Sequence, residues 1–302
     1  MQNKEPSGVL IINKHAGVTS HDIVNKIRRL YSTARVGHTG TLDPMATGVL
    51  VVLVGRAAKA AEYLVSDTKK YRAALKLGIT SDTEDTTGNI LSVSENIPSR
   101  DEVTQTCEKF VGKQKQVPPM YSALKIGGQK LCDLARRGVS VEREARDIEI
   151  FSIDLSATDQ GDLFWLDVSC SSGTYIRTLC ADIGATLGCG GAMASLERTE
   201  AGGFSIDQAT SISELEAMSL EERLAKLIPT ESLFVTLPKV PLPAFYEKLC
   251  RSGCEIYQKK ISTVYEVGQR VRFYGADGFF ALGEVREYPD GSAIKAIKTF
   301  EL

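Results

Sequence analysis

The sequence has few histidines and no cysteine pair with metal-ligand or redox spacing. All three histidines fall within the first 38 residues, and the seven cysteines include no CxxC motif. An odd number of cysteines, several of them inside apolar patterns, favours reduced buried thiols over a disulfide framework. We therefore expect no metal ion. The cysteines are Cys107, Cys132, Cys170, Cys180, Cys189, Cys250 and Cys254.

A long apolar run at the N-terminus and a strong net charge are also missing. The first apolar run, residues 9–12, is too short for a signal peptide or a membrane span, so we expect a cytoplasmic protein with no membrane partner. The net charge of -2 over 302 residues produces no global basic field that would attract nucleic acid. Residues 125–146 carry six Lys or Arg against three acids, and composition alone assigns this modest patch equally well to a solvated helix face.

One carboxylate stands in a turn rich in glycine and threonine, "GHTGTLDPMATG", from Gly37 to Gly48. This residue, Asp43, precedes Pro44 and the unbroken apolar run 49–54, which periodicity assigns to either a buried strand or a buried helix. A lone Asp in a turn usually only satisfies backbone N–H groups. The alternative is a reactive acid at the end of a core strand, which would need a fixed cation to stay ionised.

Arg177 is a candidate for that cation. It lies in the first turn of a predicted amphipathic helix, just after a predicted strand that ends at Cys170. Sequence alone does not bring Arg177 next to Asp43.

Other patterns predict both helices and strands. Ser20 is expected to cap a helix, and Ser99 and Ser219 begin capping boxes. A change in the apolar alternation near Ser152 indicates a strand that changes face. Strands are predicted at 9–13, 71–79 and 164–170, a short helix at 131–137, and a small β domain after a proline-bearing linker.

Six motifs in order make residues 8–205 resemble the bacterial-type tRNA pseudouridine-55 synthases. They are "NKHAGVTSHDIV", "GHTGTLDPMATGVL", "KKYRAALKLG", "QVPPMYSALKIGGQ", "CSSGTYIRTL" and "SLERTEAGGF". Enzymes of this family detach uracil from its ribose, rotate it and rejoin it through carbon, without a metal or an organic cofactor. The resemblance implies isomerisation of uridine 55 in the tRNA T loop to pseudouridine, by base flipping and an aspartate-initiated mechanism.

The resemblance also implies three catalytic residues. Asp43 matches the family's catalytic aspartate, which starts the reaction at the ribose or at the base. Arg177 matches the arginine paired with that aspartate. Tyr71 matches the tyrosine that stacks on the target uracil and is the favoured proton-transfer group. Without the resemblance, Tyr71 would be assigned to the core of an alternating strand.

Four further matches imply substrate-binding residues. Tyr175 and Leu196 match residues that line the uridine pocket. His38 matches the histidine that occupies the space left by the extruded base, and Lys14 matches a lysine near the active-site entrance. Without the resemblance, Leu196 would be assigned to the core, His38 would be assigned as the cap of a turn, and Lys14 would be assigned to the surface.

The fold implied is α+β, with a mixed, largely antiparallel sheet. We expect a pseudouridine-synthase catalytic domain at 1–230 with a thumb-like insertion at about 100–146, a linker at 231–243, and a PUA-like RNA-binding β domain at 244–302. The expected partner is the T stem-loop of tRNA, bound by a monomer, with no DNA partner.

Three alternatives remain open. The chain could be a non-catalytic RNA-binding module that assists tRNA folding on the same scaffold, or a relative acting within a guide-RNA particle. A carboxylate-based glycosidase would need a second acid, for which Asp82, Glu84 and Asp85 are available.

The sequence departs from the family pattern at three positions. His15 stands where proline is usual, Ser172 where a basic residue is common, and Glu197 where arginine is frequent. All three are expected to reduce positive charge or rigidity near the RNA-binding face.

Overall fold

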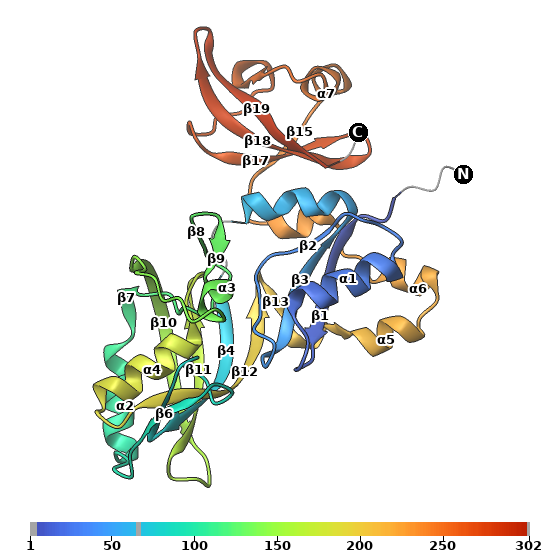
Figure 1. The fold of residues 1–302 in the computed structure, drawn as a ribbon. Coiled ribbons are helices and arrows are strands. Elements are labelled where there is room, and N and C mark those ends of the chain that lie inside the picture. Colours follow the sequence, from blue (N-terminus) through green and yellow to red (C-terminus); the bar gives the residue numbers. More distant parts are fainter. Residues whose placement is uncertain (1–4, 65–67, 301–302) are drawn as a thin grey trace.

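A mixed sheet forms the frame of the larger part of the molecule in the computed structural model, which describes residues 5–64 and 68–300 (Figure 1). Its strands are β1 (Gly8–Lys14), β2 (Val36–His38), β3 (Thr47–Val54), β4 (Lys69–Leu77), β7 (Gly112–Gln116), β10 (Arg146–Ala157), β11 (Leu163–Cys170), β12 (Gly191–Ala201), β13 (Phe204–Ser205) and β14 (Thr210–Ser211). The strand order is β14-β1-β3-β12-β4-β11-β10-β7, with β13 beside β12 and β2 beside β3. In this sheet, among the described residues, only β1–β14 and β12–β3 are parallel pairs, so the expected fold class is confirmed.

The apolar run after Asp43 is a strand, β3, covered on both faces. Leu50, Val52 and Val54 pack into one core cluster. Val49, Val51 and Leu53 alternate with them and pack into a second cluster on the other face. Because both faces are buried, the run shows no apolar–polar alternation, which is why periodicity could not separate strand from helix.

The first helix ties the N-terminal segment to the loop that carries Asp43. Helix α1 (Ser20–Leu30) is capped by Thr19, so the expected cap at Ser20 was wrong by one residue. The Thr19 side chain accepts from Asp22 N, and the Asp22 carboxylate accepts in return from Thr19 N. The Ser20 hydroxyl instead turns inward, where it accepts from Leu42 N at 2.8 Å and donates to Leu42 O at 3.1 Å.

Several other predicted elements are confirmed. The capping boxes begin α2 (Arg100–Lys109) and α6 (Leu220–Ala225), and the amphipathic stretch forms α4 (Ile176–Thr186). The predicted change of face in β10 is a register shift between Ile150 and Ser152. Short elements complete this part of the chain: η1 (Gly55–Tyr63), β5 (Ile79–Ser81), β6 (Ile90–Val93), η2 (Ile206–Gln208) and α5 (Ile212–Ala217).

The segment expected to form a thumb-like insertion divides into two parts. Residues 100–116 supply α2 and β7, and β7 pairs with β10 at one edge of the sheet. Residues 117–145 hold the small hairpin β8 (Lys125–Ile126) and β9 (Gln129–Lys130), followed by α3 (Leu131–Ala135). Figure 1 shows this hairpin above α3 in the view, and its two strands form a sheet of their own.

The last fifth of the chain adds a second sheet. Its strands are β15 (Lys239–Pro241), β16 (Ile256–Tyr257), β17 (Arg270–Gly275), β18 (Gly278–Tyr288) and β19 (Gly291–Thr299). They lie in the order β15-β17-β18-β19-β16, with α7 (Ala244–Arg251) and η4 (Gln258–Lys260) beside them. The stretch 231–243 is therefore not a free linker, because it contributes most of η3 (Thr230–Phe234) and all of β15.

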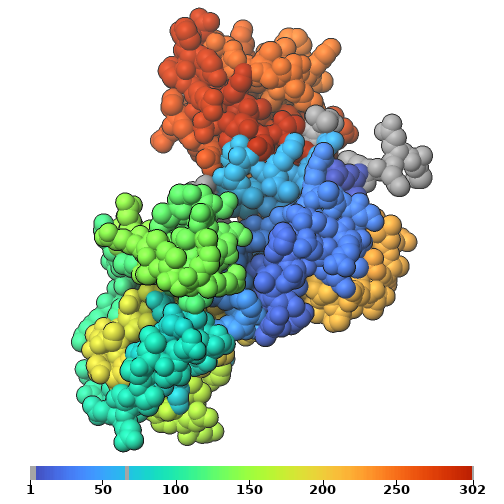
Figure 2. Space-filling view, viewed as in Figure 1, coloured from blue at the N-terminus to red at the C-terminus, as the bar shows by residue number. Residues whose placement is uncertain are grey.

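An apolar and hydrogen-bonded junction joins the two sheets (Figure 2). Phe234 packs with Phe279 and Phe300 in the same core cluster as β3, with ring centroids 6.3 and 5.9 Å away. The Tyr63 hydroxyl donates to Ile297 O at 3.1 Å. The C-terminal sheet thus covers apolar surface of the larger sheet. In the described residues, no helix is long and apolar enough to cross a membrane.

The turn that carries Asp43 ends at a glycine that the fold requires. Gly48 has φ +96°, and a Cβ there would lie 2.3 Å from Arg198 O. We expect Gly48→Ala to lower the free energy of unfolding by about 3 kcal/mol or more, through strain and overlap. Gly203 has φ +79° and nothing within 4 Å of a built Cβ, so Gly203→Ala should cost only about 1 kcal/mol. Urea unfolding measures both, and equal losses would contradict the close approach to Arg198.

Candidate active site

Asp43 and Arg177, 134 residues apart in sequence, form an ion pair with two contacts. Arg177 Nε lies 2.8 Å from Asp43 Oδ2, and Nη2 lies 3.3 Å from Oδ1. The Arg177 side chain is 5% exposed, whereas that of Asp43 is 34% exposed. The cation is therefore held inside the protein while the carboxylate remains reachable from solvent. The structure brings together the pair that sequence could only suggest.

Arg177 is held by other groups as well. Its Nη1 donates to Thr83 O at 3.0 Å and its Nη2 to Tyr121 O at 2.7 Å. On a further side, Asp85 Oδ2 lies 3.9 Å from Nη1. Because these contacts fix the plane of the guanidinium, its Nε edge is presented to Asp43 in one orientation.

Lys14 lies beneath the Asp43 turn and not at an entrance. Its side chain is fully buried, and Nζ donates to Pro44 O at 3.2 Å, Ala46 O at 2.6 Å and His15 O at 3.0 Å. These bonds hold the backbone on the C-terminal side of Asp43. The expected substrate-binding role at the entrance is therefore corrected: in this structure Lys14 positions the turn.

Burial lowers the pKa of Lys14 to about 8, although the charge of Asp43 opposes the shift. The Arg198 guanidinium lowers that pKa further. A lysine with no solvent exposure and only carbonyl acceptors loses the hydration that stabilises its charged form.

Two tyrosines stand near the ion pair. Tyr71, on β4, is 8% exposed, and burial raises the pKa of its phenol, which also senses the charge of Asp43. Tyr175 precedes α4, and burial likewise raises the pKa of its phenol. Both phenols are therefore neutral at neutral pH.

Leu196 packs with Tyr71, and His38 lies close enough to Arg198 for that charge to lower its pKa. Leu196, on β12, is buried in the same cluster as Tyr71, and its carbonyl lies 3.5 Å from the Thr47 hydroxyl. His38 ends β2, and its Nδ1 is buried without a hydrogen-bond partner. Burial lowers the pKa of His38, so the ring is neutral at neutral pH.

Two positioning residues escaped the sequence reasoning. Arg198 is 1% exposed, and its Nε and Nη2 donate to Val49 O at 2.7 Å and Gly40 O at 3.1 Å. Gln116, at the end of β7, donates to Tyr175 O at 3.0 Å and accepts from Tyr175 N at 2.8 Å. Both act on backbone groups far away in sequence, and no local pattern signals such contacts.

The acids required by the glycosidase alternative do not form a second reactive carboxylate. Asp85 is 6% exposed, and its Oδ1 accepts from Thr83 and Thr87. The Asp82 carboxylate accepts hydrogen bonds from the backbone N and the side-chain Nδ2 of Asn89. The Glu84 carboxylate accepts one from the Thr178 hydroxyl at 2.6 Å. Asp85 therefore supports Arg177 and is not available to a substrate.

The side chain of Glu197, one of the three residues that depart from the family pattern, lies on the face of the sheet opposite to that of Tyr71. Leu196, Glu197 and Arg198 oppose Ala73, Arg72 and Tyr71 in the β12–β4 register. Because side chains alternate along a strand, Glu197 and Arg72 point away from the face that carries Tyr71. Glu197 therefore adds no charge on the face of the sheet that carries Tyr71.

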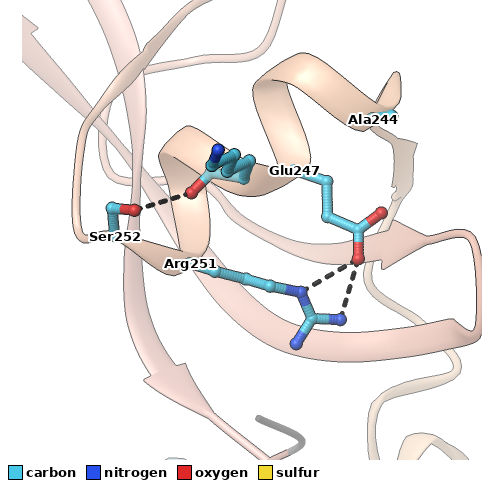
Figure 3. Close-up of a pocket in the computed structure, with 5 residues that line it drawn as sticks. Ala244, Glu247, Arg251 and Ser252 are labelled. Carbon is cyan, nitrogen blue, oxygen red and sulfur yellow. Dashed lines mark hydrogen bonds and ion pairs between the residues drawn. The ribbon is translucent and has the colours of Figure 1, made fainter.

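Other surface features lie elsewhere in the fold. A hollow beside α7 is lined by Ala244, Glu247, Lys248, Arg251 and Ser252, and the Glu247–Arg251 ion pair spans it (Figure 3). This hollow belongs to the C-terminal domain and holds none of the candidate site residues. Among the described residues, no group of three or more His, Cys, Asp or Glu side chains could hold a metal ion.

Replacing Lys14 tests its buried charge. Lys14→Met should lower the free energy of unfolding by about 2 kcal/mol, because buried carbonyl acceptors lose their donor. The pKa of Lys14 is about 8 in the folded protein and 10.5 in the unfolded chain. Between these two pH values the unfolded chain binds more protons, so the contribution of Lys14 to stability rises with pH. The gap between native protein and Lys14→Met should thus widen from about pH 7 to about pH 9.5 in urea titrations. Exposed Lys113 provides the control Lys113→Met, and a gap independent of pH would contradict the assignment.

Comparison with known proteins identifies the family. Residues 28–176 match the family model described as "TruB family pseudouridylate synthase (N terminal domain)". Residues 177–235 match "tRNA pseudouridylate synthase B C-terminal domain". A protein of Alkaliphilus oremlandii (strain OhILAs) named "tRNA pseudouridine synthase B" is 44% identical, with 93% of each chain covered. One of the same name from Aromatoleum aromaticum is 40% identical over 94% of this chain and 90% of the relative.

Solved structures agree on the fold. A chain in "Crystal Structure of a Cbf5-Nop10-Gar1 Complex" is 25% identical with a TM-score of 0.74, covering 97% of this chain and 84% of that one. A chain in "Structure of H/ACA RNP bound to a substrate RNA containing 2'-deoxyuridine" has a TM-score of 0.73 at 22% identity, covering 98% of this chain and 85% of that one. The family models together span more than half of the chain, and the relatives cover nearly all of it. This chain belongs to the TruB family of pseudouridylate synthases.

Proposed function

We propose that the chain is a tRNA pseudouridine synthase that converts uridine 55, in the T loop of tRNA, to pseudouridine. The observation that carries the proposal is the Asp43–Arg177 pair, with a buried cation and a solvent-accessible carboxylate. Its relatives at 40–44% identity bear the name tRNA pseudouridine synthase B. The structures from guide-RNA particles are only 22–25% identical, which favours a tRNA substrate over a guide-RNA particle.

The target base must leave the RNA stack to reach Asp43. Extruding a base costs a few kcal/mol, least in a loop, and the site must replace the lost stacking. Tyr71, Tyr175 and Leu196 supply aromatic and aliphatic surface around the ion pair, which suits them to line the uridine pocket. The neutral imidazole of His38 is suited to occupy the space that the base leaves in the RNA.

The reaction begins with Asp43. Its carboxylate attacks the ribose or the base, the bond from ribose to nitrogen breaks, and the uracil turns and rejoins through C5. Arg177 keeps the carboxylate ionised and aimed, so little reorganisation is needed as charge moves. Tyr71 is the proton-transfer group that removes hydrogen from C5.

The non-catalytic alternative predicts no need for an ionised acid. A module that only binds and folds RNA would tolerate an amide at position 43. The Asp43–Arg177 geometry favours chemistry, because nothing in RNA binding alone requires a partly exposed carboxylate aimed by a fully engaged guanidinium.

The remaining features of the proposal concern the whole molecule. We infer that the enzyme acts as a monomer in the cytoplasm, on the T stem-loop of tRNA and not on DNA, without a metal or cofactor. The C-terminal domain, 244–302, is proposed to bind RNA beyond the T stem-loop. In support, contacts from Tyr63 and Phe234 hold it against the larger sheet, so both sheets can face one tRNA.

Substitution of the catalytic acid separates the two functions. Asp43→Asn should reduce pseudouridine formation in an unmodified tRNA transcript by about 100-fold or more, because an amide cannot act as an anion. Binding of tRNA and the unfolding midpoint should change little. Exposed Asp167, on β11, gives the control Asp167→Asn with native activity. Product at a position other than the T-loop uridine would contradict the substrate, and an active Asp43→Asn protein would contradict the mechanism.

A charge-reversal variant tests the C-terminal domain. Lys259 and Lys260 are exposed on η4 and are not part of the aromatic cluster of Phe234, Phe279 and Phe300. Reversing both, with Lys259→Glu and Lys260→Glu, should weaken binding of full-length tRNA several-fold and leave binding of an isolated T stem-loop hairpin unchanged. Equal affinity of the native and reversed proteins for full-length tRNA would remove these lysines from the RNA-binding surface.

A further inference from the structure

Arg198 is a buried cation that the proposed reaction has not used. Only 1% of its surface is exposed, and its hydrogen bonds to Val49 O and Gly40 O are to neutral carbonyl groups. In the part of the chain that the structure describes, no carboxylate lies within ion-pair distance of its guanidinium. A buried charge without a counter-charge costs several kcal/mol, so its retention beside a reactive site calls for an explanation.

The Tyr71 phenol lies against this guanidinium. Arg198 and Tyr71 oppose each other in the β12–β4 register, so their side chains share one face of the sheet. The Arg198 guanidinium lies close enough to the phenol to lower the pKa of Tyr71, against the larger opposite effect of burial. Arg198 therefore joins the Asp43 turn, through Gly40 and Val49, to the tyrosine that removes a proton.

Other charged or titratable groups surround the two residues. Asp43 and Cys170 face the phenol, and both would oppose negative charge on it. Lys14 and His38 lie close enough to Arg198 to sense its charge. The Lys69 ammonium approaches Arg198 at Gly40, where a built Cβ would lie 3.2 Å from Lys69 Nζ and 3.5 Å from Arg198 Nη1. Arg198 is the residue directly opposite Tyr71 in the β12–β4 register.

We propose that Arg198 is a positioning residue for proton transfer, which holds Tyr71 and stabilises its phenolate form. The inference rests on the proposed function. In the step concerned, the phenolate oxygen forms a bond to the hydrogen on C5 of the uracil. The electron pair of the broken C–H bond restores the C5–C6 double bond of the ring, and N1, freed from the ribose, takes up a proton from water. The phenol later gives its own proton to water, so that no net proton is lost. Negative charge on the phenol oxygen before the transfer faces the Arg198 cation.

A purely structural role makes a different prediction. If Arg198 only binds Val49 O and Gly40 O, its loss would loosen the Asp43 turn and lower the rate by the same factor at every pH. If it stabilises the phenolate, removing its charge raises the pKa of Tyr71 further, so the rise of rate with pH moves to higher pH. Lys14 and His38 also titrate, so the effect must be shown to depend on Tyr71.

The experiment measures tritium release from C5 of labelled uridine in a full-length tRNA transcript, in single turnover with excess enzyme, across a pH series. Arg198→Met removes the charge and Arg198→Lys keeps it. Arg198→Gln is the second neutral variant if Arg198→Met does not fold. Arg272 provides the matched control, because it is also a buried arginine bonded to two carbonyls, Leu237 O and Val235 O, but lies in the C-terminal domain.

We expect Arg198→Met to lose more than about tenfold in rate near neutral pH, with its pH profile displaced upward by about one unit or more. Arg198→Lys should keep the profile within a few tenths of a unit, and Arg272→Met should change stability alone. In a Tyr71→Phe background, Arg198→Met should cause less than about twofold further loss, because the two residues act together.

Two results overturn the inference. One is an equal loss at all pH values for Arg198→Met and Arg198→Lys, and the other is the full additional loss in the Tyr71→Phe background. If the native protein releases no tritium at all, the proposed function fails first, and the inference falls with it. Release by the native protein without the displacement overturns the inference alone.

Discussion

The site depends on how firmly the protein holds one guanidinium. Arg177 is fixed by the carbonyl groups of Thr83 and Tyr121 and by the nearby carboxylate of Asp85, so its remaining edge meets Asp43 in a single orientation. Only the cation of this pair is buried, because the Arg177 side chain is 5% exposed and that of Asp43 is 34% exposed, so solvent moderates the cost of losing the carboxylate. The same contacts bring three distant segments of the chain together, because β5–β6, the 117–145 segment and α4 all meet at this side chain.

The turn that carries Asp43 is supported from the opposite side. Lys14 binds its backbone after the acid, Ser20 binds Leu42 just before it, and Arg198 binds Gly40 and Val49 at its two ends. Rigidity at this turn has a chemical reason, because a reactive carboxylate misplaced by about 1 Å can lose two orders of magnitude in rate. The buried cations among these supports also give the region a local positive charge that the overall charge of -2 conceals. Such a region favours a polyanionic substrate.

Local patterns predicted local structure well. The capping boxes at Ser99 and Ser219 and the alternation in β11 appear in the structure as expected, because they depend on residues within one or two turns or along one strand. The cap of α1 moved to Thr19, since two neighbouring hydroxyl residues can both cap and only packing against Leu42 decides between them. The segment expected as a linker contains β15, whose pairing with β17 is a tertiary contact with no sequence signature.

The site was only partly predictable for the same reason. Asp43 and Arg177 were candidates from the turn and the predicted helix before the resemblance matched them to a family, but the residues alone left their pairing open. The resemblance placed Lys14 near the entrance, and its residue type alone favoured a surface charge, yet here carbonyl acceptors replace water. Arg198 went unnoticed because an arginine on an alternating strand gives no sign of whether its guanidinium faces solvent or a buried tyrosine.

The central claim is that the forked geometry of Arg177, and not merely its charge, makes Asp43 reactive. The most direct measurement is the single-turnover rate of pseudouridine formation by Arg177→Lys at saturating enzyme, together with its affinity for tRNA. A lysine keeps the charge but cannot bind the carboxylate and two carbonyl groups in one plane, so the rate should fall by about 100-fold with tRNA affinity unchanged. A rate close to that of the native protein would show that charge alone suffices and would contradict the claim.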